Sequence, residues 1–140
     1  MITYSDKIKV EEYNGLRRAV GWEPLEETQA MRGIANSAFV IVAYDGERAV
    51  GLTRVISDGG YANLIADVMV QPEYQGQQIG KYMVTAAVDY LRTTINEEQF
   101  LMINIMASKG KEDFYEKLGF TKRPNETMGS GLVMWLNKPR

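Results

Sequence analysis

The stretch from Ile65 to Leu91 constrains the fold of this chain most, because it reads as a buried strand, a polar loop and a long helix. Its first six residues are mostly apolar and rich in β-branched side chains, which is typical of a strand covered on both faces. Pro72 ends that strand because proline cannot donate a ladder hydrogen bond. From Ile79 onward, apolar residues recur at the spacing of an amphipathic helix.

The loop between this strand and this helix is a candidate anion site. The first N–H groups of a helix lack intrahelical acceptors and lie at the positive end of the helix dipole. Gly76 and Gly80 leave room for a bulky group to approach the backbone. The loop matches neither the P-loop pattern nor the dinucleotide-binding fingerprint. We expect a phosphate-bearing cofactor here, and a turn that needs glycine only for packing is the alternative.

Composition narrows the possible chemistry. The chain has 140 residues, which fits a single domain over 1–140. It has no cysteine and no histidine, so we expect no disulfide, no catalytic triad that uses histidine and no metal site. Proton transfer must therefore use a carboxylate, tyrosine, lysine, water or the substrate itself.

Charge and hydropathy narrow the possible partners. The net charge is −2, and no basic block of the kind that nucleic-acid-binding proteins carry is present. No apolar run is long enough to span a bilayer, and the N-terminus lacks the pattern of a signal peptide. We therefore expect no nucleic-acid partner, no membrane association and a cytoplasmic location.

Periodicity and turn signals predict the order of the elements. Asp45-Gly46 and Asp58-Gly59-Gly60 separate three strands of an antiparallel meander. The strand at 100–107 follows a helical crossover, so it should lie parallel to the strand at 61–70. Helices are expected at 10–20, 26–36, 79–96 and 111–118. Strands are expected at 2–4, 38–44, 47–56, 61–70, 100–107, 120–122 and 132–136.

Two segments resemble the GNAT superfamily of N-acetyltransferases. The stretch 68–81 is similar to the family's acyl-CoA-binding motif, Arg/Gln-x-x-Gly-x-Gly/Ala, with Gln75 and Gly80 at its first and last positions. Gln78 stands where the family usually has glycine. The segment Phe-Tyr-Glu-Lys-Leu-Gly-Phe at 114–120 resembles a second family motif. The resemblance implies the GNAT fold, an α/β arrangement in which a mostly antiparallel mixed sheet is flanked by about four helices.

The resemblance also implies acetyl-CoA as the cofactor. Its pantetheine arm would pair with backbone where the strand at 61–70 separates from the strand at 100–107. Its pyrophosphate would bind the loop N–H groups. Lys81 and Lys111 would reach phosphates, or alternatively are surface lysines, and Ser108 stands where the family often has asparagine. The implied cofactor-binding residues are Val68, Met69, Val70, Gln75, Gly76, Gln77, Gln78, Ile79, Gly80, Lys81, Ser108, Lys111 and Tyr115.

Two residues are candidates for proton transfer. Tyr115 matches the family tyrosine that protonates the departing CoA thiolate, and a phenol with a pKa of about 10 keeps its proton at neutral pH. Because Phe114 and Leu118 form the apolar pair of that helix, we expect Tyr115 to point elsewhere. Asp67, a carboxylate in an apolar strand, is the candidate general base. The alternatives are an aspartate that holds the strand to a loop by hydrogen bonds, and a relay through water.

The sequence thus predicts an N-acetyltransferase that moves an acetyl group from acetyl-CoA to the primary amine of a small molecule by direct attack in a ternary complex. A backbone N–H of Met69 or Val70 would polarise the thioester carbonyl. Polyamines, arylalkylamines and amino sugars all stay open as acceptors. A non-catalytic acyl-CoA-binding module is the alternative function, and a homodimer through the C-terminal strands is compatible with the sequence. The acceptor-pocket candidates are Trp22, Arg54, Tyr61 and Asn63.

Overall fold

The computed structural model describes residues 1–138, and the chain divides into two compact units at Ile105 and Met106. The prediction of one domain over 1–140 stays a prediction. The first unit contains β1 (Ile2–Ser5), α1 (Val10–Ala19), α2 (Glu27–Ala35), β2 (Phe39–Asp45), β3 (Arg48–Ser57), β4 (Ala62–Val70), the 3-10 turn η1 (Pro72–Tyr74), α3 (Ile79–Arg92) and β5 (Met102–Ile105). The second unit contains α4 (Glu112–Lys117).

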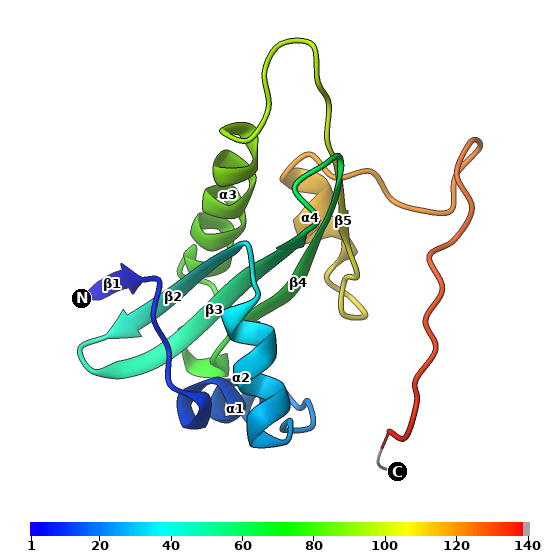
Figure 1. Ribbon diagram of the computed structural model, residues 1–140. Helices are drawn as coiled ribbons and strands as arrows, with labels where there is room; N and C mark the ends of the chain where they lie inside the picture. The colour runs from blue at the N-terminus through cyan, green and yellow to red at the C-terminus, as the bar shows by residue number, and fades with distance from the viewer. Residues whose placement is uncertain (139–140) are drawn as a thin grey trace. The chain divides into compact units, whose positions relative to one another are not determined.

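The strands form one sheet in the order β1-β2-β3-β4-β5 (Figure 1). The first three neighbouring pairs are antiparallel, whereas β5 lies parallel to β4. The α3 crossover makes this parallel pair possible, since parallel neighbours need a long connection. The predicted α/β fold class, the antiparallel meander and the parallel fifth strand are therefore confirmed.

Helices cover both faces of the sheet. On one face, Tyr13 and Leu16 of α1 pack with Val42 and Leu52 of the sheet. On the other face, α3 buries its apolar side against a second core, which contains Ile41, Ala43, Val50, Ile79 and Met83. This arrangement follows from strand residues that alternate between the two faces. Burial of each large apolar side chain stabilises the fold by roughly 1.5–3 kcal/mol.

β4 extends past the end of β5. The parallel register runs from Ala62 opposite Met102 to Ile65 opposite Ile105. Beyond that point β4 continues to Val70 on its β3 side, and no other strand among residues 1–138 pairs with its outer edge. The first unit therefore has the strand separation that the family resemblance implies.

Three predictions of regular structure are wrong. The described part of the chain has no strand after Ile105, so the strands expected at 120–122 and 132–136 are not formed. β-forming residues adopt a strand only when they pair with another strand, and neither segment pairs with a strand in the described chain. The helix expected to reach Asn96 ends at Arg92, because the hydroxyls of Thr93 and Thr94 donate to the carbonyls of Tyr90 and Leu91.

Candidate active site

The turn before α3 has two residues with left-handed backbone. Gly76 has φ 79° and Gln78, the N-cap of α3, has φ 69°. A side chain is disfavoured in this region, whereas glycine enters it freely. This backbone conformation explains why glycine is usual at this position of the motif. Gln78 adopts the same conformation, so the turn keeps its shape without a glycine.

The backbone N–H groups of this turn are the next feature of the site. Among the residues that the structure describes, no acceptor pairs with any backbone N–H from Gly76 through Lys81, and the first N–H of the helix to be satisfied is that of Tyr82, which donates to the Gln78 carbonyl at 3.0 Å. The side chains of Gln75 and Gln77 fold away from these donors and donate to the carbonyls of the preceding segment. The turn is therefore a candidate anion site at the positive end of α3.

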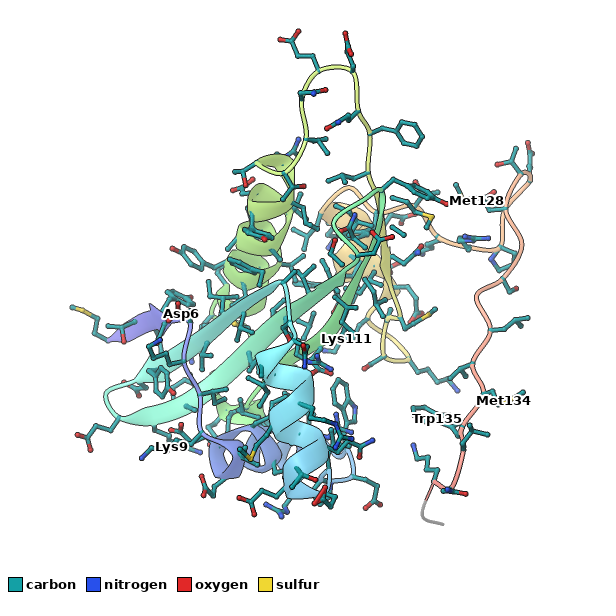
Figure 2. All side chains as sticks on the ribbon, viewed as in Figure 1. Asp6, Lys9, Lys111, Met128, Met134 and Trp135 are labelled. Carbon is teal, nitrogen blue, oxygen red and sulfur yellow. The ribbon has the colours of Figure 1, made fainter. Side chains whose placement is uncertain are left out.

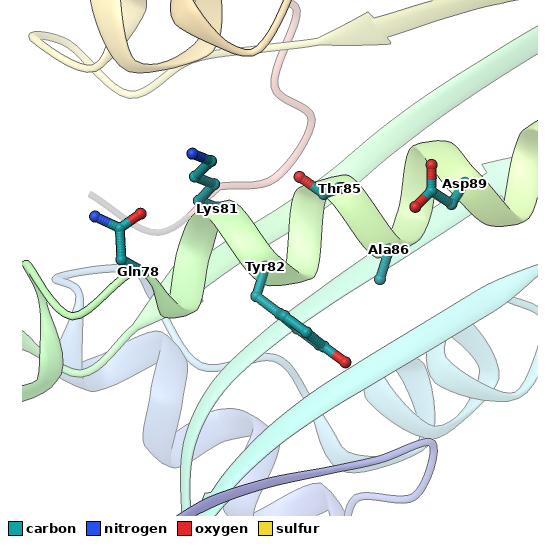
Figure 3. Close-up of a pocket in the computed structure, with 6 residues that line it drawn as sticks. All are labelled: Gln78, Lys81, Tyr82, Thr85, Ala86 and Asp89. Carbon is teal, nitrogen blue, oxygen red and sulfur yellow. The ribbon is translucent and has the colours of Figure 1, made fainter.

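A shallow hollow of about 440 Å³ runs along the exposed face of α3. Figure 3 shows its lining, in which Lys81 and Thr85 project to the same side of the helix while Tyr82 projects to the other. Gln78 and Lys81 belong both to this hollow and to the turn. The surface next to the free N–H groups is therefore open, and one lysine supplies positive charge there.

The last residues of β4 present main-chain groups on the unpaired edge. The N–H of Gln71 donates to the Val50 carbonyl on β3 at 2.8 Å. Since hydrogen-bonding direction alternates along a strand, the groups of Val70 and Val68 face away from β3, and those of Met69 face toward it. The Val70 carbonyl already accepts a hydrogen bond from Gln75 Nε2 at 3.1 Å. The N–H of Val70 is thus the better placed of the two candidates for polarising a bound carbonyl.

Asp67 lies in a buried polar cluster beneath α1. Its Oδ2 accepts hydrogen bonds from the Tyr13 hydroxyl at 2.7 Å and from Arg54 Nε at 2.6 Å. Its Oδ1 lies 4.0 Å from Arg17 Nη1, and Asp67 itself is 6% exposed. These contacts tie β4 to α1 and β3, which is the geometry of the alternative in which Asp67 holds the strand in place. The role of Asp67 as a base stays a prediction.

The partners of Asp67 keep fixed protonation states near neutral pH. Burial raises the pKa of Tyr13, and the charge of Asp67 raises it further. Burial by itself would lower the pKa of Arg54, but the attraction of Asp67 outweighs burial and the pKa is raised. The phenol therefore stays neutral and the guanidinium stays charged.

Sequence reasoning missed two members of this cluster, Tyr13 and Arg17. The Arg17 guanidinium carbon lies 6.0 Å from the centre of the Tyr13 ring and 5.4 Å from the centre of the Trp22 ring. Arg17 thus contacts Trp22 directly, and it shares the carboxylate of Asp67 with Arg54. Trp22 and Arg54 are two of the predicted acceptor residues. The spacing of four residues between Tyr13 and Arg17, which places both on one helix face, was the available signal.

The other two acceptor candidates lie at the start of β4. Asn63 donates from Nδ2 to the carbonyls of Tyr61 and Met102, whereas Tyr61 is 56% exposed. Asn63 and Asp67 are four positions apart on the strand, a distance of roughly 13 Å. The structure therefore divides the four predicted acceptor residues into two groups and does not bring them together.

Tyr115, Ser108 and Lys111 belong to the second unit. Tyr115 is 8% exposed, and it lies between Phe114 and Phe120, with ring centres 5.0 and 6.0 Å from its own. Our expectation that Phe114 would be the core residue and that Tyr115 would point elsewhere is wrong, because Tyr115 is the buried residue of α4. Burial raises the pKa of Tyr115 to about 12. Ser108 and Lys111 are exposed and form the turn that starts α4.

No helix among residues 1–138 has both the length and the apolar character that a membrane crossing requires.

The sequence resembles known acetyltransferases. The family model described as the acetyltransferase (GNAT) domain matches residues 36–122. An uncharacterized N-acetyltransferase of Pyropia yezoensis is 29% identical over 134 residues, which cover 91% of this chain and 74% of that protein. The chloroplastic GCN5-related N-acetyltransferase 2 of Arabidopsis thaliana is 29% identical over 152 residues, which cover 94% of this chain and 56% of that protein.

The fold is also similar to solved structures. A probable acetyltransferase of methicillin-resistant Staphylococcus aureus, described as a protein of unknown function, superimposes with a TM-score of 0.86 and 28% identity. The match covers 97% of this chain and all of that one. A GNAT family protein of Streptococcus pneumoniae has the same fold, with a TM-score of 0.75, 24% identity and coverage of 99% and 98%. The chain therefore belongs to the GNAT family and is an acyl-CoA-dependent N-acetyltransferase.

Proposed function

We propose that this protein transfers the acetyl group of acetyl-CoA to the primary amine of a small molecule by direct attack in a ternary complex. One observation carries the proposal: within residues 1–138, the N–H groups from Gly76 through Lys81 have no partner, and they follow a β4 edge that is unpaired after Ile65. A diphosphate suits a cluster of N–H donors at a helix N-terminus, and an amide-bearing extended chain suits a free strand edge. Acetyl-CoA contains both groups.

In this proposal the main chain of the first unit binds and polarises. The turn N–H groups hold the diphosphate, and Lys81 adds charge. The outer main-chain groups of Val68 and Val70 pair with the pantetheine amides, and the Val70 N–H donates to the thioester oxygen, where negative charge develops during attack. Bound acetyl-CoA supplies the electrophilic carbonyl and a thiolate leaving group.

Tyr115 is the proposed acid for that thiolate. Because its pKa is about 12, the phenol is protonated throughout the physiological range. A base must also remove a proton from the amine, and Asp67 and a relay through water both stay candidates. The predicted cytoplasmic location and the homodimer belong to the same proposal.

Calorimetry tests the cofactor part of the proposal. We expect acetyl-CoA to bind much more tightly than S-acetylpantetheine, which carries the amides and thioester but no diphosphate. Equal affinities would contradict a role for the turn, and no binding of acetyl-CoA would overturn the proposal.

Release of free thiol with a panel of polyamines, arylalkylamines and amino sugars tests turnover. Tyr115→Phe should lower kcat about 100-fold at an unchanged KM for acetyl-CoA, since a positioned acid contributes on that scale. Tyr90→Phe is the matched control and should turn over normally. The wild-type rate should not decline on the alkaline side below the pKa of about 12. Tight binding with no turnover of any amine would favour the non-catalytic alternative.

A further inference from the structure

The polar cluster beneath α1 contains more positive than negative charge. Arg17 and Arg54 each carry a guanidinium, whereas Asp67 carries a single carboxylate. The pKa of the Tyr13 phenol is raised by burial, so this fourth member of the cluster is neutral. Both arginine side chains are largely buried, at 16% and 13% exposed. A positive charge that is withdrawn from water without a counter-charge costs free energy, and a bound anion would offset this cost.

The excess charge belongs to Arg17. Arg54 is held on both sides, because its Nε donates to Asp67 at 2.6 Å and its Nη1 donates to a carbonyl of α2 and to a hydroxyl just after α2, each at 3.2 Å. Arg17 has one hydrogen bond within residues 1–138, from Nε to the Glu23 carbonyl at 2.6 Å. Its Nη1 lies 4.0 Å from Asp67 Oδ1, which is beyond hydrogen-bonding distance. The two Nη groups of Arg17 therefore have no acceptor in the described chain.

These donors are accessible, and an aromatic ring lies beside them. In residues 1–138, the side-chain atoms that are both buried and unpartnered are Thr53 Oγ1 and Asn63 Oδ1. The Nη atoms of Arg17 are unpartnered but are not in this group, so they reach solvent. The Trp22 ring, whose centre lies 5.4 Å from the guanidinium carbon, is half-buried. A free guanidinium fork binds the two oxygens of a carboxylate or phosphate, and the ring can contact the apolar part of the same ligand.

The cluster lies beside the part of β4 that is proposed to hold the thioester. Asp67 directly precedes Val68 on β4. Three positions, roughly 10 Å, separate Asp67 from Val70, whose N–H is the proposed donor to the thioester oxygen. One acceptor can therefore place an amine at the thioester and an anion at Arg17 only if several bonds separate the two groups.

We propose that Arg17 binds the anionic group of the acceptor, and that the acceptor is an amine joined to a carboxylate or phosphate through several atoms. This inference rests on the proposed function, because it names the class of its acceptor. It favours phosphorylated amino sugars and ω-amino acids over polyamines, which would bring only positive charge to a cluster that already has an excess. Arg17 determines specificity and takes no part in proton transfer.

Tryptophan fluorescence measures binding at this site without acetyl-CoA and without turnover. The chain has two tryptophans, and Trp135, which Figure 2 labels, belongs to the second unit. In a Trp135→Phe background, Trp22 is the remaining indole, and a ligand bound to Arg17 should change its emission.

Two matched pairs of ligands are titrated against this background. We expect 6-aminohexanoate to bind at least about tenfold more tightly than hexylamine, or glucosamine 6-phosphate to bind at least about tenfold more tightly than glucosamine, since hydrogen bonds to charged groups contribute on that scale. The pair that shows the difference identifies the anion as a carboxylate or a phosphate. No difference within either pair would overturn the proposal.

Variants of Arg17 test the assignment to this residue. Arg17→Gln should lose the preference for the anionic ligand, whereas Arg18→Gln, which removes the same charge from an exposed neighbour on α1, should keep it. Arg17→Lys keeps the charge but not the planar fork, so its preference should fall severalfold. This conservative variant carries the test if Arg17→Gln does not fold. A full preference in the Arg17 variants would contradict the proposal.

Turnover distinguishes this outcome from that of the proposed function. At saturating acetyl-CoA, Arg17→Gln should raise KM for the anionic amine at least about tenfold with little change in kcat, because Arg17 contacts the end of the acceptor that does not react. A lower kcat at an unchanged KM would overturn this role. Selective binding in the fluorescence experiment without turnover of any amine would support the anion site and count against the proposed function alone.

Discussion

The turn before α3 and the cluster around Asp67 are both polar regions of the first unit, but they differ in how their groups are satisfied. The turn has main-chain donors from Gly76 to Lys81 with no partner in the described chain. The cluster has side chains whose charges and hydroxyls bind one another at 2.6–2.7 Å around Asp67. The turn therefore has backbone donors that are available to a ligand, whereas the groups of the cluster already satisfy one another within the fold.

The largest expected effect is on stability, from Asp67→Asn. This change leaves the guanidiniums of Arg17 and Arg54 without their buried counter-charge, and breaking a buried ion pair costs about 3–5 kcal/mol. Urea unfolding should show this loss in free energy of unfolding. Asp89→Asn, at an exposed ion pair with Arg92, is the control and should change stability by less than about 1 kcal/mol.

The pH–rate profile of Asp67→Asn distinguishes a structural role of the cluster from a catalytic one. If the variant unfolds like the wild type but loses the acidic limb of its pH–rate profile, the cluster is catalytic and not structural. An unchanged acidic limb would argue against Asp67 as the base.

The next effect concerns the turn. Gly80→Asp places a carboxylate in the first turn of α3, where the helix dipole tolerates it, but where it competes with a diphosphate for the free N–H groups. We expect affinity for acetyl-CoA to fall at least about tenfold, or about 1.4 kcal/mol, at nearly unchanged thermal stability. Calorimetry measures the affinity. Gln29→Asp, in the first turn of α2, adds the same charge elsewhere, and an equal loss in that variant would refute the assignment of the turn.

The smallest expected effect is on stability and comes from the left-handed backbone of the turn. Gln78→Gly removes the cost of a side chain at φ 69°, partly offset by the greater entropy of glycine in the unfolded chain. We expect a gain of about 0.5 kcal/mol in free energy of unfolding, with unchanged affinity for acetyl-CoA. Gln77→Gly, at a neighbouring residue without positive φ, should instead lose stability, as chemical denaturation can show.

Local patterns predicted most of the first unit. Helical periodicity placed the start of α3 at Ile79, and the turn signals placed the hairpins, because both depend on neighbours in sequence. The family resemblance identified the turn as a candidate phosphate site. This prediction needed no particular side chain, because the donors are backbone N–H groups.

Contacts between residues far apart in the chain could not be predicted from the sequence. Tyr13 and Asp67 are 54 positions apart, and no spacing rule connects them. Whether Leu132–Leu136 becomes a strand depends on a partner edge, which its own residues do not encode. The burial of Tyr115 likewise depends on Phe120, which lies beyond the end of its helix.

The length by which β4 exceeds β5 has a consequence for solubility. Unmated strand edges are templates for aggregation, and proteins limit them by keeping them short or by placing proline next to them. Here the exposed edge ends at Val70, and Pro72 follows two residues later, so that no further main-chain donor extends it. Pro72 thus limits how far a neighbouring chain could pair along the outer side of β4.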